Sequence, residues 1–166
     1  MEITLRAWNE SDIGFLVTYA NNKNIAANMT DSFPYPYERV NAENFIRFAN
    51  QDEPTRIFAI EADGVLCGGI GLHPQSDIQF RNLELGYWLA EPFWGKGIAT
   101  AAIKKVLPIG FAREGITRIF ARPFGRNIGS QKALEKAGFK LEATLKNALF
   151  KWGKFEDELI YSIQKP

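Results

Sequence analysis

A chain of 166 residues has the length of one domain, and it can bury roughly 68–70% of its unfolded surface, so it needs neither a disulfide nor a metal for stability. Its 20 basic and 19 acidic residues leave a formal charge of +1, which argues against general nucleic-acid binding, because that depends on many Lys and Arg contacts to phosphates. Since Cys67 is the single cysteine and no apolar run reaches about 18 residues, we expect a cytoplasmic protein with no intramolecular disulfide and no membrane partner.

The first fifty residues predict one strand and two helices. Residues 3–7 alternate as in a strand. A helix then starts near Ser11 and Asp12, which are good N-cap types, and its inward positions are Ile13, Leu16, Val17 and Ala20. The prolines between Phe33 and Tyr37 make that segment a loop. A second helix follows, with inward residues Val40, Phe45, Ile46 and Ala49.

The middle of the chain predicts a hairpin, another strand and a long helix. The dipeptide Asp63-Gly64 is a strong hairpin signal between its neighbouring apolar runs. Strands are therefore expected at 56–62, 65–72 and 83–90. The helix runs from Ile98 to Arg113 and stops at Gly115, and Pro108 inside it should cause a kink.

The last third predicts a strand, a short helix and a final hairpin. The strand covers 116–122, and the helix covers 130–136 and is closed by Gly138. The hairpin turns at Gly153 and joins the strands at 142–149 and 158–163. Strands and helices do not alternate strictly along the chain, so the order indicates an α+β fold on a mixed sheet rather than a doubly wound fold.

The most informative stretch joins the strand at 83–90 to the helix at 98–113 through a turn that contains Gly95 and Gly97. Backbone N–H groups and the positive end of the helix dipole converge there, and glycine lets the main chain approach a phosphate, so the stretch predicts an anion site. A P-loop does not fit, because Gly-x-x-x-x-Gly-Lys-Ser/Thr is absent. A Rossmann fingerprint fits poorly, since its third glycine would fall at Thr100.

This turn resembles the acetyl-CoA loop of the GNAT acetyltransferases, Gln/Arg-x-x-Gly-x-Gly/Ala. Gly97 and Ala99 occupy the two small positions, whereas Trp94 departs from the pattern by replacing the leading Gln/Arg. The run Trp-Gly-Lys-Gly after Gly-Tyr-Trp-Leu resembles the RimJ/RimL-type branch of the family in particular.

A second motif strengthens the resemblance. The run from Asn127 to Phe139 is similar to the later helix of the same family, Asn-x-x-Ala/Ser followed by Glu-Lys-x-Gly-Phe. Asn127 has the residue type of an N-cap, and Gly138 has that of a left-handed C-cap. Two motifs in the family's order, about thirty residues apart, rarely coincide by chance, although each alone could be an ordinary turn or a well-capped helix.

The resemblance implies a GNAT fold over residues 1–166 as one N-acetyltransferase domain, with a mixed, mostly antiparallel sheet of about seven strands flanked by about four helices. It also implies acetyl-CoA as cosubstrate and no metal. The loop amides would hold the pyrophosphate, and amides near Leu89 and Ala90, at a strand bulge, would face the pantetheine arm and the thioester oxygen. The implied cofactor residues are Trp88, Leu89, Ala90, Trp94, Gly95, Lys96, Gly97, Ile98, Ala99, Thr100, Asn127 and Ser130.

Glu84 is the expected catalytic base, acting directly or through a water, because similar enzymes place a glutamate here. On its strand it alternates with Leu83 and Leu85 and shares a side with Gly86 and Trp88. The alternative is a structural ion pair, with Arg81 or Arg122 as the partner. Many family members protonate the leaving thiolate with a tyrosine at the position of Leu134. The expected catalytic donor here is therefore Ser130, or water.

The expected acceptor is a primary amine, either a protein N-terminal α-amine or a small-molecule amine, and the resemblance favours a homodimer. Candidate pocket walls are aromatic residues: Tyr35, Tyr37, Phe80 and Trp152. Two other functions stay open, a non-catalytic acyl-CoA-binding regulator and an interaction module without a CoA site. We expect Cys67 to be a small buried apolar residue rather than a nucleophile served by His73.

Overall fold

In the computed structural model of residues 1–166, seven strands form one sheet in the order β1-β2-β3-β4-β5-β7-β6. β4 and β5 pair in parallel, whereas the β1–β2, β2–β3, β5–β7 and β6–β7 pairs are antiparallel. The strands are β1 (Ile3–Arg6), β2 (Ile57–Ala62), β3 (Val65–Pro74), β4 (Asn82–Leu89), β5 (Arg118–Ala121), β6 (Lys140–Lys151) and β7 (Lys154–Gln164).

Five α-helices accompany the sheet, and two of them are only about one turn long, so the mostly antiparallel α+β prediction is confirmed. None of the helices is long and apolar enough to span a bilayer. The helices are α1 (Ile13–Phe15), α2 (Lys23–Ala26), α3 (Arg39–Ala49), α4 (Ile98–Phe111) and α5 (Ile128–Lys136).

The chain divides into two compact units. The first comprises residues Met1–Gly71 and Tyr87–Ile98, and the second comprises Leu72–Gly86 and Ala99–Pro166. The organisation of residues 1–166 as one N-acetyltransferase domain stays a prediction.

The first helical segment of unit 1 begins close to the predicted position but has another capping residue. Asn9 is the N-cap: its side chain accepts from the Ser11 N–H at 3.0 Å, and its own N–H donates to the Asp12 carboxylate at 3.0 Å. The helix start predicted near Ser11 and Asp12 is confirmed, since α1 begins at Ile13 directly after a 3-10 turn at Glu10–Asp12. The capping side chain, however, is that of Asn9, and Asp12 closes its capping box. Of the four residues predicted to point inward, Leu16 and Ala20 are buried, and Ile13 and Val17 pack beside them partly exposed.

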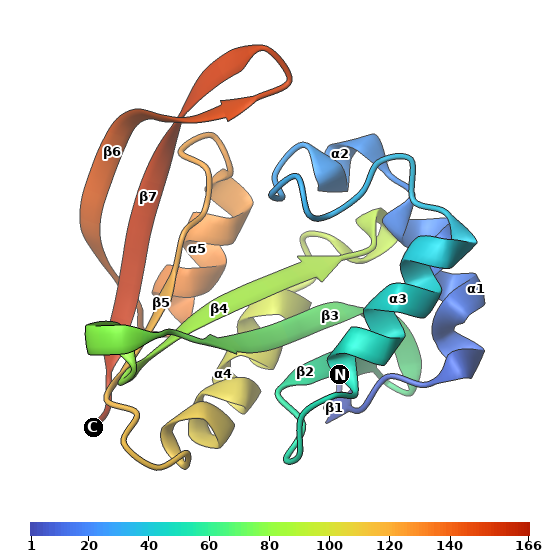
Figure 1. The fold of residues 1–166 in the computed structure, drawn as a ribbon, viewed down its shortest axis with the longest axis horizontal. Coiled ribbons are helices and arrows are strands. Elements are labelled where there is room, and N and C mark those ends of the chain that lie inside the picture. The colour runs from blue at the N-terminus through green and yellow to red at the C-terminus, as the bar shows by residue number, and fades with distance from the viewer. The chain divides into compact units, whose positions relative to one another are not determined.

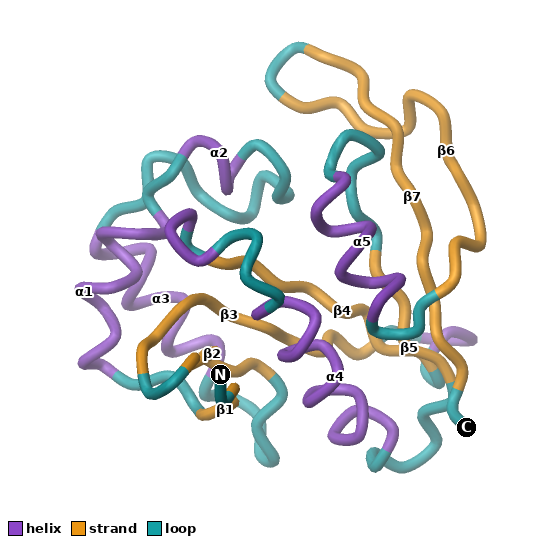
Figure 2. Tube along the Cα trace, turned by 180° about the vertical axis from the view of Figure 1, so that it is seen from behind, coloured by secondary structure: helices purple, strands orange, loops and turns teal.

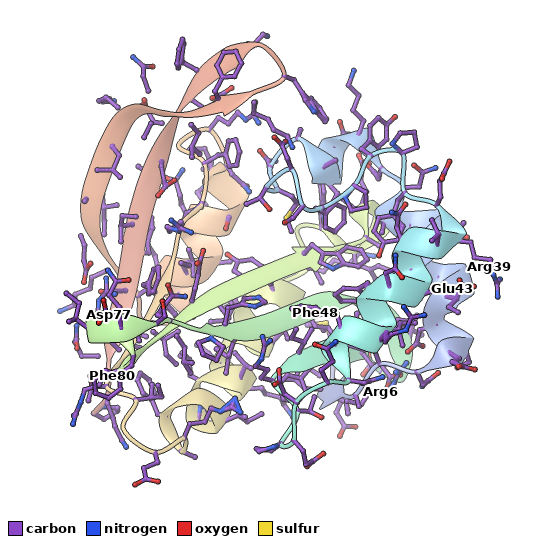
Figure 3. The ribbon with its side chains drawn as sticks, viewed as in Figure 1. Arg6, Arg39, Glu43, Phe48, Asp77 and Phe80 are labelled. Atoms are coloured by element: carbon purple, nitrogen blue, oxygen red, sulfur yellow. The ribbon has the colours of Figure 1, made fainter.

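Helix α3 starts at Arg39, and its buried residues are Ala42, Ile46 and Ala49. Val40 was expected to point inward but is 52% exposed, because the helical period that buries positions 42, 46 and 49 turns position 40 towards solvent. Figure 3 shows Arg39 and Glu43 on the outer side of this helix, where they form an ion pair at 2.8 Å.

In unit 2, helices α4 and α5 pack against the strands. Gly110 of α4 lies against the side chains of Leu72 and Ile119, and the Tyr161 hydroxyl of β7 donates to Glu135 of α5 at 2.9 Å. Figures 1 and 2 both place α5 alongside the β6–β7 hairpin, which is longer than the sequence predicted. Pro108 lies inside α4 as expected, but the helix ends at Phe111 rather than Arg113.

Candidate functional site

The loop that follows β4 in unit 1 has the backbone shape that the sequence predicted. After a 3-10 turn at Glu91–Phe93, Gly95 and Gly97 adopt φ values of 73° and 78°, and α4 begins at Ile98. Side chains with a Cβ disfavour this left-handed region, so glycine is the favoured residue at both positions. The indole N–H of Trp94 donates to the Leu89 carbonyl at 2.8 Å, which folds the loop back on the strand end.

The end of β4 is fixed to β3 in a way that corrects one expectation. The Ala90 N–H donates to the Cys67 carbonyl at 2.8 Å, so it is already satisfied and does not point at a bound thioester. In this geometry the Ala90 amide is occupied, which leaves the Leu89 amide as the better placed candidate for the oxyanion role, and both assignments stay predictions. Cys67 itself is fully buried, and burial raises the pKa of its thiol, which confirms its expected role as a small apolar residue.

The same loop is tied to α2 through Glu91. Its carboxylate accepts from the side-chain amides of Asn22, at 2.7 Å, and Asn24, at 3.1 Å. These hydrogen bonds lower the pKa of Glu91, and Asn22 is also the N-cap of α2. The contact links the start of the loop to a segment about 70 residues earlier in the chain, a link that no local sequence pattern indicates.

Trp88, expected to bind the cofactor, belongs to an aromatic cluster in the core of unit 1. Its ring centroid lies 6.1 Å from that of Phe15 and 5.8 Å from that of Phe33, and the Tyr37 ring lies 5.5 Å from Phe33 at an angle of 45°. Tyr37 is only 4% exposed, and burial raises its pKa to about 12, so it presents almost no surface for a pocket wall. Tyr35, in contrast, is exposed.

The second motif forms the first turn of α5 in unit 2. The Asn127 side chain accepts from the Ser130 N–H at 3.2 Å, so the predicted N-cap is confirmed. Leu134 is fully buried. The position at which the resemblance implied a tyrosine is thus a buried leucine, which has no group that could donate a proton.

Glu84 forms the ion pair that the sequence left open as its alternative role, and its partner is Arg122. The two N···O distances of this fork are 3.0 and 3.1 Å, and the Arg122 guanidinium also lies 3.8 Å from the Glu158 carboxylate. The Glu84 hydrogen bond raises the pKa of Arg122, which stays cationic. An ionised carboxylate has about four acceptor positions, so the fork leaves room for an amine or a water.

Arg122 and Glu158 also line an open pocket of about 350 Å³ in unit 2. Its other charged wall residue, Arg118, pairs with Glu142 and donates to Asn82 at 2.8 Å. The Arg118 hydrogen bond, followed by that of Ser162, lowers the pKa of Glu142. Every charge along this wall is thus compensated by a neighbour. The complete lining is Gln75, Gln79, Asn82, Arg118, Phe120, Arg122, Leu145, Glu158 and Ile160.

The remaining candidate pocket residues lie elsewhere in unit 2. Phe80 follows the short 3-10 turn at Asp77–Gln79, as Figure 3 shows, and it is exposed beneath the Arg81 guanidinium at 5.7 Å. Trp152 is exposed at the β6–β7 turn. Arg81, the other partner considered for Glu84, therefore contacts an aromatic ring instead.

The chain belongs to the acetyltransferase (GNAT) domain family, which matches residues 2–140. The "Putative ribosomal N-acetyltransferase YdaF" of Bacillus subtilis is 36% identical over 103 residues, which is 62% of this chain and 56% of that protein. The spermidine N(1)-acetyltransferase of Vibrio cholerae is 28% identical over 158 residues, covering 94% of this chain and 89% of the relative. The chain thus spans little more than half the length of the first curated relatives that it matches.

Solved structures confirm the predicted fold. The ribosomal L7/L12 α-N-protein acetyltransferase RimL, in complex with coenzyme A, has a TM-score of 0.83 at 21% identity, over 98% of this chain and 93% of RimL. The microcin C7 self-immunity acetyltransferase MccE, bound to acetyl-CoA and AMP, has a TM-score of 0.82 at 26% identity, over 99% and 93% of the two chains. The expected resemblance to the RimJ/RimL-type branch therefore holds at the level of fold.

Proposed function

We propose that this protein is an acetyl-CoA-dependent N-acetyltransferase that acts on a primary amine by direct attack in a ternary complex. The observation that carries the proposal is the loop from Gly95 to the start of α4, whose left-handed glycines open the backbone at a helix N-terminus. Membership of the GNAT family and the acetyl-CoA or CoA bound by MccE and RimL support the choice of cosubstrate.

The cofactor would lie along the end of β4 and the loop that follows. The backbone N–H groups of Gly95 to Thr100 would hold the pyrophosphate, and the Leu89 amide would face the thioester oxygen. Asn127, the N-cap of α5, and Ser130, in its first turn, are also proposed to contact the cofactor. A cytoplasmic location and a homodimer stay predictions.

Glu84 is the proposed base. An α-amine has a pKa of about 7.7–8.0 and a lysine amine about 10.4, so deprotonation at neutral pH costs roughly 1 and roughly 4–5 kcal/mol, respectively. The neutral amine nitrogen attacks the thioester carbon, a C–N bond forms, and the C–S bond breaks. Glu84 takes the amine proton, directly or through a water, and the CoA thiolate takes a proton from Ser130 or from water.

The acceptor is proposed to be a protein N-terminal α-amine or a small-molecule amine. The compensated charges along the pocket of unit 2 do not provide the surplus of carboxylates that a polyamine would need. The spermidine acetyltransferase of Vibrio cholerae, whose structure contains CoA and spermine, therefore supports the reaction type more than the substrate.

Calorimetry with acetyl-CoA on the wild type and on Gly97→Trp tests the proposal. We expect binding by the wild type and none by Gly97→Trp, because an indole would fill the space of the phosphates. Gly64→Trp is a matched control, since Gly64 has φ 77° against 78° for Gly97 and also faces open space, but it lies in the β2–β3 turn. Absence of binding by the wild type would remove acetyl-CoA from the proposal, and binding without turnover on an amine panel would favour the non-catalytic regulator.

A further inference from the structure

Gly68 of β3 occupies a position that has no room for any side chain. A methyl group added there would lie 2.1 Å from the Trp88 carbonyl oxygen and 2.9 Å from the Leu89 Cα. Both are backbone atoms, so no change of rotamer relieves the contact. Neighbouring Gly69 is different, because the tight contacts of its added methyl would be with the indole rings of Trp8 and Trp88, each at 3.0 Å, and the nearest backbone atom, the Phe58 carbonyl oxygen, lies at 3.6 Å.

The close approach at Gly68 means that the β3 and β4 backbones depart from a regular ladder at this point, where β3 also carries one extra residue, Cys67, against β2. In a regular sheet a neighbouring strand lies about 4.7–4.9 Å away, and its carbonyls point within the sheet, not over the face on which a Cβ stands. The Trp88 carbonyl instead lies over the face of β3 at Gly68. Two residues later, the Ala90 N–H binds the Cys67 carbonyl, so Cys67 and Gly68 together fix the end of β4.

The orientation of one peptide group has a direct consequence for the N–H that follows it. In a trans peptide the carbonyl and the next N–H point in opposite directions. With the Trp88 carbonyl turned onto Gly68, the Leu89 N–H points away from β3. Because the Ala90 amide is occupied by Cys67, Leu89 is the residue whose amide this geometry aims outward.

We propose that Gly68 is a positioning residue for the acyl donor. By lacking a side chain, it lets the Trp88 carbonyl cross the face of β3, and it thereby aims the Leu89 N–H at the thioester oxygen and sets the path of the loop to Gly97. This inference rests on the proposed acetyl transfer and adds to it a residue outside both sequence motifs.

The test compares Gly68→Ala with wild type and with Gly110→Ala in steady-state kinetics and acetyl-CoA calorimetry. Gly110→Ala also adds a clash, 2.8 Å from Ile119 Cδ1, but its three nearest contacts are side-chain tips in the packing of α4. Removing one oxyanion donor costs about 10²–10³ in kcat, and a donor turned away from the oxygen is lost in the same way. We expect a kcat loss of that size in folded Gly68→Ala, together with weaker acetyl-CoA binding, whereas Gly110→Ala loses stability and keeps the kcat of its folded fraction.

The wild type supplies a second measurement that does not depend on the folding of a variant. In protein labelled with ¹⁵N-leucine, the Leu89 amide resonance should differ between the complexes with acetyl-CoA and with CoA, because only the former carries the thioester oxygen. If the two complexes give the same Leu89 shift, or if Gly68→Ala matches Gly110→Ala in kcat, the inference is wrong while the proposed function stands. If the wild type binds no acetyl-CoA, both fail together.

Discussion

The end of β4 in unit 1 and the ion-paired residues Glu84, Arg122 and Glu158 in unit 2 differ in the chemical groups that determine their structure. The first is shaped by backbone groups and apolar rings: a carbonyl over Gly68, an amide on Cys67 and an indole on Leu89. The second is a chain of charges, in which Arg122 lies between Glu84 and Glu158. Substitutions should therefore act on the first region through shape, at any pH, and on the second through charge.

The largest expected effect is in the charged region. Glu84→Gln keeps the shape of the side chain and removes the base, so we expect kcat/KM to fall by about 10²–10⁴. The loss should be greater for a lysine-like amine than for an α-amine, because its deprotonation costs more. Initial rates with both amine types across pH check this.

Arg122→Gln is the matched control for that experiment, since it breaks the same ion pair and keeps the carboxylate. If Glu84 is only structural, the two variants should lose similar stability and similar activity. A Glu84→Gln enzyme with the kcat/KM and the pH profile of the wild type would show that Glu84 is not the base.

Asp12 is the one buried carboxylate of unit 1, and we expect its charge to stabilise the fold and to take no part in acetyl transfer. The 5% exposed carboxylate accepts two hydrogen bonds from Arg6, at 2.8 and 2.9 Å, and one from the Asn9 N–H. Asp12→Ala should lower the free energy of unfolding by about 1–3 kcal/mol in urea titrations at pH 7. Glu43→Ala, which breaks only the exposed pair with Arg39, should stay within about 0.5 kcal/mol.

The pH dependence of this contribution has a definite sign. Burial opposes the ionisation of Asp12, but the hydrogen bonds from Arg6 and Asn9 outweigh it and lower its pKa. The stabilisation is therefore present above the unfolded pKa of about 3.9 and is lost as the pH falls through the lower folded value. Asp12→Ala should be correspondingly less sensitive to acid, and equal acid sensitivity in both proteins would contradict the assignment.

A smaller effect on acetyl-CoA binding is expected from a substitution at the end of β4 and the loop that follows it. Trp94→Phe removes the indole N–H that donates to the Leu89 carbonyl, a bond with a net value of about 0.5–1.5 kcal/mol. The Kd for acetyl-CoA should then rise about two- to twelvefold, by the same amount at pH 6 and pH 8. A rise that depends on pH would show that charge also shapes this loop.

The smallest effect should follow Ser130→Ala. The N-cap of α5 uses the Ser130 backbone N–H, which alanine retains, and a thiolate with a pKa near that of cysteine, about 8.5, leaves with little help. We expect kcat to fall less than about tenfold. A loss of a hundredfold would instead identify the hydroxyl as the proton donor.

Several local features could be predicted from the sequence because they depend on neighbouring residues alone. The Asp63-Gly64 turn, the Gly97 loop and the Asn127 cap all appear where their residue types require them. Two other features were predicted less well: which residue caps the first helical segment, where the cap is Asn9, and which face of α3 is buried, where Val40 is exposed. In both cases neighbouring residues have similar character, and the surrounding packing decides between them.

Sequence alone determined the order of strands and helices, the family and the glycine-lined loop, because periodicity, turn geometry and motif spacing are written within short segments. Only the tertiary structure decided which partner holds Glu84, what occupies the Ala90 amide and why position 68 must be glycine. These three facts depend on contacts between residues about 20 to 40 positions apart. Strand register and the irregular end of β4 bring those residues together, and no local pattern encodes either.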